Sequence, residues 1–206
     1  MAQKKKQKQE VKQEPKGKVK LTEVAAMLQM MHEKQEAYEA LIQRSLVVFK
    51  PDAVQRGIVG ELLSRFERVG LKIVGTKMVN PDRDHYYKHY EVIGKMITRR
   101  GEPAFNYTLD FMSSGPVIAF VFEGIEAVEL IRKIVGSTEP KAADMGTIRG
   151  DYAHMSFGYS NRKKIGVPNL IHASGDPEEA EKEIAHWFQP EELQQGYHTL
   201  AERYVR

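Results

Sequence analysis

Hydrophobic positions follow two patterns along the chain, one typical of helices and one typical of strands. Spacing near 3.6 residues predicts helices over 21–43, 58–69, 82–96, 104–111, 125–135 and 176–188. Compact apolar runs predict strands over 45–49, 71–79, 116–122 and 152–157. Gly70, Gly136 and a Gly-Glu-Pro break at 101–103 separate neighbouring elements, and 158–168 is predicted as polar loop.

The order of these elements predicts the fold class. After the first helix they follow one another as β-α-β, helices, β-α-β and a final helix. This is the split βαβ, ferredoxin-like order, an α+β fold with an antiparallel sheet. The final helix has the clearest start, because Asp176 can cap it, Pro177 suits its first position and Glu179 completes a capping box.

Three regions are predicted along the chain. Residues 1–20 contain only Val11 and Val19 as branched apolar residues and are predicted to be a disordered basic tail. Residues 21–43 form a helical extension that packs on the body or on a neighbouring subunit. Residues 44–206 form the body, which we predict to be a single domain.

Composition excludes several classes of protein. The chain has 206 residues, 41% hydrophobic and 29% charged, which is typical of a folded soluble protein. It has no cysteine, so disulfides, thiol nucleophiles and cysteine-bound metals are excluded. No apolar run approaches the ~18 residues of a membrane span, and the lysine-rich start is no secretory signal. A cytoplasmic protein without membrane contact is expected.

The net charge of +3 is unevenly distributed. Residues 1–20 hold eight lysines against two glutamates, so the tail carries +6 and the rest of the chain −3. A basic surface for nucleic acid is therefore not expected on the body. For the tail two interpretations stay open, an electrostatic arm for RNA or anionic surfaces and a solubilising segment.

Side chains must hold any nucleotide that this chain binds, since the sequence has neither a Walker motif nor a Gly-x-Gly-x-x-Gly turn. Lys50 follows the first strand on a turn stiffened by Pro51, from which an ammonium can reach a phosphate or ribose. Arg132, Thr138 and Arg149 supply two planar cations and a hydroxyl suited to phosphate oxygens. Taken singly, such residues are more often a solvated lysine in a turn or a member of a surface salt bridge.

One histidine has the surroundings that a nucleophile needs. His172 lies just before the capped helix, and Glu183 follows it by eleven positions, two turns into that helix. A carboxylate that accepts one ring N–H fixes the tautomer and leaves the other nitrogen free to attack. Tyr90 can donate to a phosphate or simply pack within a helix.

Residues 44–195 resemble the nucleoside diphosphate kinase family. Many ordered matches carry the resemblance, including Lys50-Pro51-Asp52-Ala53-Val54, Arg56-Gly57-Ile58-Val59-Gly60-Glu61, Arg65-Phe66-Glu67, Ser114-Gly115-Pro116-Val117, Gly146-Thr147-Ile148-Arg149-Gly150-Asp151, Asn169-Leu170-Ile171-His172 and Trp187-Phe188.

The resemblance implies an enzyme that moves the γ-phosphate of ATP or another nucleoside triphosphate to a diphosphate through a phosphohistidine, in a ping-pong reaction. It also implies a homo-oligomer, a tetramer or hexamer, and Mg²⁺ bound through the nucleotide phosphates rather than by protein ligands. The alternative is a non-catalytic relative that binds nucleic acid or regulates another protein.

Residue roles also come from the resemblance. His172 is expected to be the nucleophile and Glu183 to orient it, with Ser174 close by. The remaining residues are expected to bind nucleotide: Lys50 the phosphates and ribose, Tyr90 the phosphate chain, Arg132, Thr138 and Arg149 the phosphate oxygens, and Asn169 the ribose.

The chain departs from the family pattern at three places. Ala173-Ser174-Gly175 stands where Gly-Ser-Asp is common, and the loops 91–102 and 153–168 are longer than usual. At the position of the aromatic that usually stacks on the base, this chain has Ala104, followed by Phe105. Either Phe105 or a loop residue such as Met96 or Ile97 is expected to stack on the base, with broad acceptance of purines and pyrimidines.

Overall fold

The computed structural model describes residues 21–199, so the predicted disordered tail lies outside the described residues. The chain divides into two compact units at Ala40 and Leu41. Within the first unit, α1 (Leu21–Glu39) is a helix of 19 residues without a buried side chain. The helix ends earlier than predicted, because Ile42 and Gln43 already belong to the first strand of the second unit.

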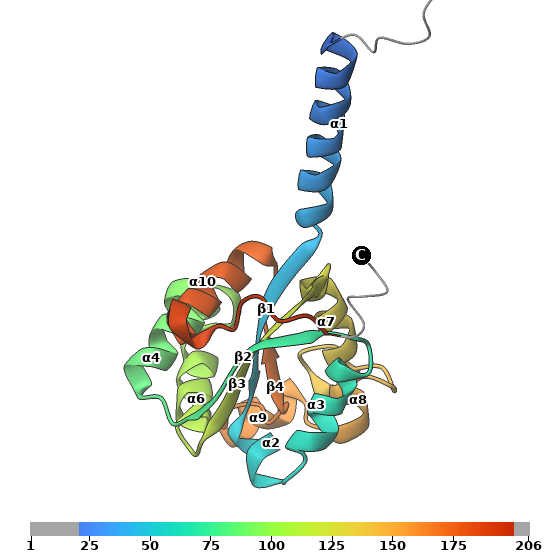
Figure 1. The fold of residues 1–206 in the computed structure, drawn as a ribbon. Coiled ribbons are helices and arrows are strands. Elements are labelled where there is room, and N and C mark those ends of the chain that lie inside the picture. The colour runs from blue at the N-terminus through green and yellow to red at the C-terminus, as the bar shows by residue number, and fades with distance from the viewer. Residues whose placement is uncertain (1–20, 200–206) are drawn as a thin grey trace, which may run out of the picture. The chain divides into compact units, whose positions relative to one another are not determined.

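The second unit is built on a four-stranded sheet of β1 (Ile42–Phe49), β2 (Lys72–Val79), β3 (Val117–Ile125) and β4 (Ile171–Ala173). The strand order is β2-β3-β1-β4, and each neighbouring pair is antiparallel. This arrangement confirms the predicted ferredoxin-like α+β fold (Figure 1).

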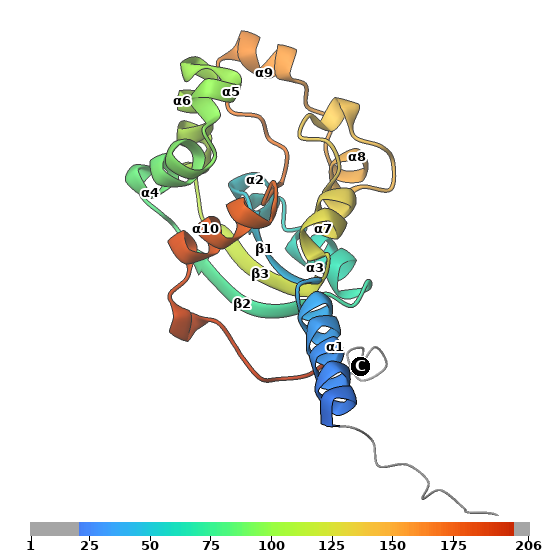
Figure 2. The ribbon, with the colours of Figure 1, turned by 90° about the horizontal axis from the view of Figure 1, so that it is seen from above.

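Helices cover both faces of the sheet (Figure 2). The elements on one face are α4 (Arg83–Tyr87), the π-helical turn η1 (Lys88–Ile93), α5 (Met96–Arg100), α6 (Glu102–Met112) and α10 (Pro177–Trp187). Those on the other are α2 (Pro51–Gln55), α3 (Val59–Glu67) and α7 (Ala127–Val135). The remaining short elements are η2 (Pro140–Ala142), α8 (Ile148–Tyr152), α9 (Phe157–Lys163) and η3 (Pro190–Glu192). None of the helices over residues 21–199 is long and apolar enough to cross a membrane.

The central strand β1 contributes to both cores. Leu46 and Val48 pack toward α6 and α10, whereas Val47 and Phe49 pack toward α3 and α7. Successive side chains of a strand point to opposite faces, so a strand covered on both faces is apolar at every position. This explains why β1 reads as a continuous apolar run, with all four of these residues at most 1% exposed.

The predicted strand at 152–157 was wrong. Tyr152 ends α8, and Ser156 caps α9 by accepting a hydrogen bond from the backbone N–H of Tyr159 (3.1 Å). The fourth strand is instead β4, which is only three residues long and is held by pairing with β1. The predicted polar loop 158–168 likewise contains most of α9.

The long loop between η1 and α6 contains the short helix α5. Lys95 precedes α5 in the left-handed conformation (φ 48°), and Gly101 follows it with φ 83°. Gly101 alone forms the predicted break at 101–103, because Glu102 and Pro103 already belong to α6, where proline suits the first turn. Both ends of α5 are therefore marked by sharp changes in backbone direction.

Candidate active site

A cavity of about 950 Å³ opens in the second unit beside the end of β1. Helices and loops from both sides of the sheet contribute to its wall. Of the residues predicted to bind nucleotide or to act in catalysis, those that line it are Lys50, Tyr90, Arg132, Thr138, Arg149, Asn169, His172 and Glu183. The fold thus brings together residues that are up to 133 positions apart in the sequence.

The antiparallel pair β1 and β4 positions the lysine and the histidine. His172 is in register with Val48, two residues before Lys50. Beyond the strands, the backbone N–H of Lys50 donates to the carbonyl of Leu170 (2.9 Å), and Asp52 accepts from the backbone N–H of Leu170 (3.0 Å). These bonds fix both side chains on one rigid framework.

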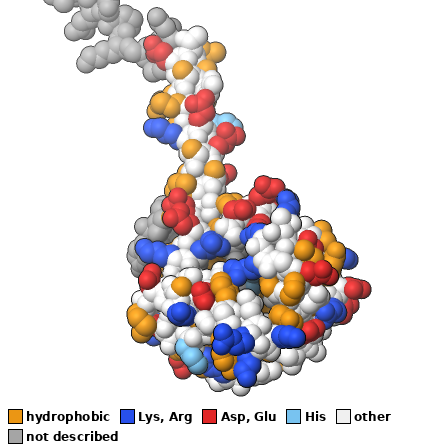
Figure 3. Space-filling model, turned by 180° about the vertical axis from the view of Figure 1, so that it is seen from behind, with side chains coloured by type: hydrophobic (Ala, Val, Ile, Leu, Met, Phe, Trp, Pro, Cys, Tyr) orange, Lys and Arg blue, Asp and Glu red, His pale blue; other side chains and the backbone are white. Residues whose placement is uncertain are grey.

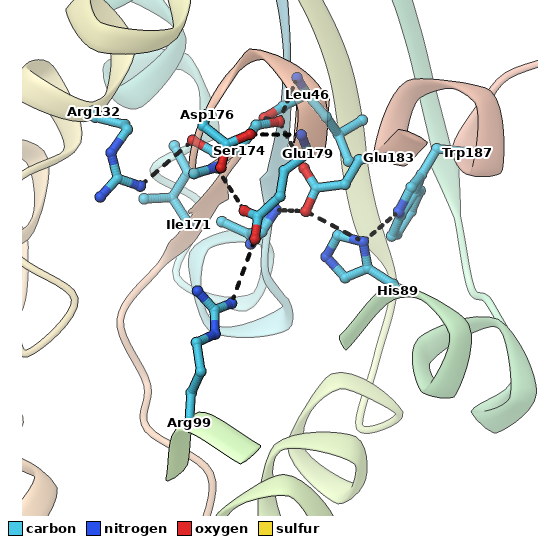
Figure 4. A network of polar contacts seen from close by, with 12 residues as sticks. Leu46, His89, Arg99, Arg132, Ile171, Ser174, Asp176, Glu179, Glu183 and Trp187 are labelled. Carbon is cyan, nitrogen blue, oxygen red and sulfur yellow. Dashed lines mark hydrogen bonds and ion pairs between the residues drawn. The ribbon is translucent and has the colours of Figure 1, made fainter. Parts of the chain in front are cut away.

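The ring of His172 is oriented by a chain of hydrogen bonds. Its Nε2 lies 2.9 Å from Oε1 of Glu183, and Ser174 donates from Oγ to Oε2 of the same carboxylate (2.6 Å). Ser174 Oγ in turn accepts from the backbone N–H of Leu46 (3.1 Å). Both Glu183 oxygens are therefore held, and Figure 4 shows the carboxylate between Ser174 and His89.

Glu183 is ionised despite being buried. Burial would raise its pKa, but the charge and hydrogen bond of His172, with His89 and Ser174, outweigh burial and lower the pKa to about 2. An ionised carboxylate can only accept, so Nε2 of His172 carries the proton in the neutral ring. The Nδ1 atom is then unprotonated and can act as a nucleophile.

A buried histidine, His89, packs against the ring of His172 and limits its movement. His89, on η1, packs edge-to-face against His172 with ring centroids 4.4 Å apart. Its Nδ1 accepts a hydrogen bond from the indole N–H of Trp187 (3.1 Å; Figure 4). Burial, and then the neighbouring His172, hold the pKa of His89 well below its usual value, so this ring is neutral. The sequence analysis missed His89, since only its place beside Tyr90 hinted at the site.

Lys50 is a buried cation with a weakened hold on its proton. Its Nζ donates to Oδ1 of Asn169 (2.8 Å), and the residue is 7% exposed. Burial, followed by the positive charge of Arg149, lowers the pKa of Lys50 to about 7. The Lys50 ammonium therefore has too little negative charge near it to keep its ordinary pKa.

Arg149 ties two backbone segments, 169–171 and the end of α7, to the cavity wall. Its guanidinium donates to the carbonyls of Asn169 (3.2 Å), Gly136 (2.9 Å) and Ile171 (2.5 Å). Burial, followed by the charge of Arg132, lowers its pKa to about 10, so it stays charged at neutral pH. Arg149 thus both joins these segments and supplies positive charge to the cavity.

Asn169 links the lysine to the loop that follows α7. While its Oδ1 accepts from Lys50, its Nδ2 donates to the carbonyl of Thr138 (2.8 Å). Arg132, on α7, lies near the carbonyl of Ser174 (3.5 Å; Figure 4) and is otherwise directed at the cavity. The predicted cations and the amide therefore act as one connected wall.

Tyr90 and Phe105 have different surroundings. Tyr90 lines the cavity, and its buried hydroxyl has no hydrogen-bond partner among the described residues. Burial raises its pKa, so the phenol keeps its proton and can donate. Phe105 is 4% exposed, belongs to the core with Leu109 and Met112, and is not among the lining residues. The periodicity of α6 turns it inward, which argues against the predicted stacking role.

Side chains from α5 and α9 line the cavity, in contrast to Phe105. Met96, Arg99 and Arg100 from α5 line the cavity together with Phe157 from α9. The guanidinium of Arg100 lies over the Phe157 ring, 4.4 Å from its centroid. The sequence analysis named Met96 but missed the arginines and Phe157; the adjacent arginine pair in the longer loop was the available signal.

The departure at Gly175 has a physical explanation. The backbone N–H of Gly175 donates to Oε2 of Glu179 (3.1 Å), and a Cβ atom on residue 175 would lie 2.3 Å from that oxygen. Glu179 also lies 3.8 Å from Arg99 (Figure 4). Glu179 thus places a carboxylate beside residue 175, where the family commonly has one from residue 175 itself.

One cluster could in principle hold a metal ion. Among the described residues, His89, His172 and Glu183 are the only three His, Cys, Asp or Glu side chains whose ligand atoms all lie within 4.8 Å of one another. Two imidazoles and one carboxylate do not match the all-oxygen shell that Mg²⁺ prefers. The same atoms already serve the hydrogen bonds around His172.

An antiparallel ferredoxin-like sheet that presents one oriented histidine and several cations to a single cavity places the protein among the phosphotransferases. A family model described as nucleoside diphosphate kinase matches residues 43–193. The chain therefore belongs to the nucleoside diphosphate kinase family, as its sequence motifs predicted.

Curated relatives and solved structures agree with this assignment. The chain is 46% identical over 153 residues to the nucleoside diphosphate kinase of Borreliella burgdorferi, covering 74% of this chain and 91% of the relative. It is 47% identical to that of Pyrococcus furiosus, covering 74% and 86%.

Two solved structures carry ligands. A transition state mimic of the enzyme from Borrelia burgdorferi, with bound vanadate and ADP, has a TM-score of 0.77 and 44% identity and covers 80% of this chain and 97% of that one. The Halobacterium salinarum enzyme in complex with CDP has a TM-score of 0.67 and 36% identity, with 80% and 98% covered.

Proposed function

We propose that this protein is a nucleoside diphosphate kinase whose phosphorylated residue is His172. The observation that carries the proposal is the bond from Nε2 of His172 to the ionised Glu183, which leaves Nδ1 free in a cavity lined by Lys50, Arg132 and Arg149. The bound vanadate and ADP of the Borrelia burgdorferi relative support a phosphoryl-transfer reaction at this kind of site.

The proposed reaction has two matched halves. Nδ1 of His172 forms a bond to the γ-phosphorus of a nucleoside triphosphate while the bond from that phosphorus to its bridging oxygen breaks, and the diphosphate leaves. A second diphosphate then takes the phosphoryl group from the histidine. Such transition states carry charge on the equatorial oxygens, so catalysis depends on positioned cations and an in-line nucleophile.

The other residues position the substrate in this proposal. Arg132, Arg149 and Thr138 bind phosphate oxygens, Lys50 reaches the phosphates and the ribose, and Asn169 contacts the ribose. The hydroxyl of Tyr90, which has no hydrogen-bond partner among the described residues, donates to the phosphate chain. Glu183 stabilises the positive charge that develops on the ring.

Magnesium fits this site as a companion of the nucleotide. The wall beside Lys50 and Arg149 is cationic and offers no all-oxygen cage among the described residues, so phosphate oxygens would hold the ion. When bound, Mg²⁺ supplies charge neutralisation of the phosphates. Homo-oligomer formation, nucleic-acid binding by residues 1–20 and a cytoplasmic location stay predictions from the sequence.

Incubation with γ-labelled ATP tests the proposed function. We expect label on the protein that is stable to base, labile to acid and transferable to a second nucleoside diphosphate. A protein that binds nucleotide but never acquires this label would contradict the proposal and favour the non-catalytic alternative.

Nucleotide affinity should depend on pH through Lys50. Below about pH 7 the Lys50 amine is already charged in the nucleotide-free protein. Above about pH 7 it is neutral there and must take up a proton when phosphates bind. The affinity is therefore expected to fall with rising pH above 7, by at most about tenfold per pH unit. Calorimetry at pH 8 in buffers of different ionisation enthalpy should show uptake approaching one proton. Lys50→Met serves as the control and should remove most of this uptake; equal uptake in both proteins would contradict the assignment.

Base stacking is expected to come from the short helices α5 and α9, which carry Met96 and Phe157. Because base–aromatic stacking contributes about 1–3 kcal/mol, Phe157→Ala should raise the nucleotide KM by about 5- to 150-fold with little change in kcat. Phe105→Ala should instead lower stability by about 3–5 kcal/mol, since it empties a core position. Steady-state kinetics and thermal unfolding of both variants decide between the two residues. A KM effect confined to Phe105→Ala would reverse our assignment.

A further inference from the structure

Along the exposed helix α1, apolar side chains recur with a repeat of seven residues in addition to the helical spacing near 3.6. A series of its side chains, which leaves out Met27 and Met30, recurs at alternating steps of three and four residues, and this is the heptad spacing of a coiled coil. With Leu21 placed at heptad position a, the a and d positions are occupied by Leu21, Val24, Leu28, Met31, Gln35 and Tyr38. A repeat of 3.5 residues keeps one seam facing a partner helix along its length.

Among the described residues of the first unit, none of this seam is buried. Leu21 is 89% exposed, Leu28 61% and Met31 56%, and no residue of α1 is buried. Figure 3 shows hydrophobic side chains open to solvent along the helix, between charged ones. Most helices in proteins are stabilised by tertiary packing of an apolar face rather than by helix propensity alone. A second helix is the partner that a heptad seam fits.

The flanking charges identify that partner and its direction. Lys34 occupies position g and Glu39 position e of the next heptad. In two parallel helices in register, each g residue faces the e residue of the following heptad in the other helix, and such pairs set partner choice and orientation. Two identical copies would therefore form two Lys34–Glu39 pairs. Antiparallel helices bring g against g and e against e, and lose both pairs.

The polar residue in the seam supports the same register. Gln35 is the only polar side chain among the six a and d positions of α1. A single polar residue at an a position specifies register in coiled coils. In the single chain the Gln35 amide donates to Glu39 of the same helix (2.7 Å), which leaves its carbonyl oxygen to accept from a partner helix. In parallel chains in register, Gln35 of one copy faces Gln35 of the other, and their amides can hydrogen-bond.

We propose that α1 pairs with α1 of a second copy of this chain as a parallel, in-register, two-stranded coiled coil. The interaction surface is the seam from Leu21 to Tyr38, flanked by Lys34 and Glu39. The inference depends on α1 alone and is independent of the chemistry proposed for the cavity.

Cysteine cross-linking in the full-length protein tests the proposal, because the chain contains no native cysteine. Met31→Cys places a thiol at position d, where paired helices bring two Cβ atoms to disulfide distance. Met30→Cys is the matched control: residue 30 is similarly exposed in the single chain (51% against 56%) but lies outside the seam. Under mild oxidation most Met31→Cys chains should run as covalent dimers on a non-reducing gel, and Met30→Cys chains as monomers.

Charge reversal tests the direction of the pair. In the Met31→Cys background, Lys34→Glu should reduce the rate of cross-linking, and adding Glu39→Lys should restore it, since the pairs are re-formed with opposite sign. Equal cross-linking of the Met30→Cys and Met31→Cys proteins, or none in either, would overturn the proposal. Failure of the double charge reversal to restore the rate would overturn the parallel register.

Discussion

Replacement of His172 by alanine is expected to lower kcat/KM for phosphate exchange between ATP and a second diphosphate by about 10⁴-fold or more. The proposed reaction passes through a bond to this ring, and removal of a covalent nucleophile leaves only binding and charge stabilisation. The phosphoenzyme should disappear in the same variant. The measurements are coupled exchange kinetics and acid-labile labelling from γ-labelled ATP.

Variants of Glu183 and Lys133 serve as comparisons for this result. Glu183→Ala should be milder than His172→Ala, because the ring loses the partner at 2.9 Å but keeps a nucleophilic nitrogen. Lys133→Ala, at the exposed edge of the cavity, should retain most of the activity. Wild-type exchange rates in His172→Ala would rule out the phosphohistidine.

Loss of Arg149 should damage stability and activity together. In Arg149→Ala, the carbonyls of Asn169, Gly136 and Ile171 lose their donor within a largely buried region. Unsatisfied buried carbonyls cost about 1–3 kcal/mol each, and these three lie at the wall of a cavity. We therefore expect the lower part of the summed range, a loss of about 3–5 kcal/mol in the free energy of unfolding. For a domain of this size that corresponds to a fall in Tm of roughly 6–20 °C. Thermal unfolding and steady-state kinetics of the same preparation check both effects.

Arg132→Ala distinguishes nucleotide binding by an arginine from its contribution to the stability of the cavity wall. Its guanidinium makes one long contact, to the Ser174 carbonyl at 3.5 Å. The change should therefore raise the nucleotide KM while leaving Tm nearly constant. If Arg149→Ala proved as stable as Arg132→Ala, the hydrogen bonds from Arg149 to the three carbonyls would not contribute to the stability of the fold.

Local signals in the sequence predicted the helices well. The cap, proline and glutamate at 176–179 marked the start of α10, and Gly70 and Gly136 adopt the positive φ that helix-ending glycines favour. The helix α10 then carries Glu183 to His172, as its spacing suggested. Where one element determines its own boundaries, the sequence was sufficient.

Features that depend on distant partners were harder to predict. The three-residue strand β4 exists because β1 pairs with it, and nothing in Ile171-His172-Ala173 alone indicates a strand. The residues 152–157 resemble a strand by composition, yet Ser156 caps a helix there. Phe105 was selected from its place next to Ala104, whereas packing on α6 decided its environment. Tertiary contacts decided the strand β4 and the environment of Phe105, whereas at Ser156 a local helix cap prevailed over the strand-like composition.

The backbone at the two ends of α5 has a consequence for how this family diversifies. Left-handed Lys95 and Gly101 isolate a five-residue helix that carries Met96, Arg99 and Arg100 to the cavity. No strand of the sheet runs through this segment. Its length and side chains can therefore change in evolution or in the laboratory without altering the strand register that holds the histidine. Substitutions at the cavity-lining positions of this segment are therefore expected to change substrate preference more than the chemistry at His172.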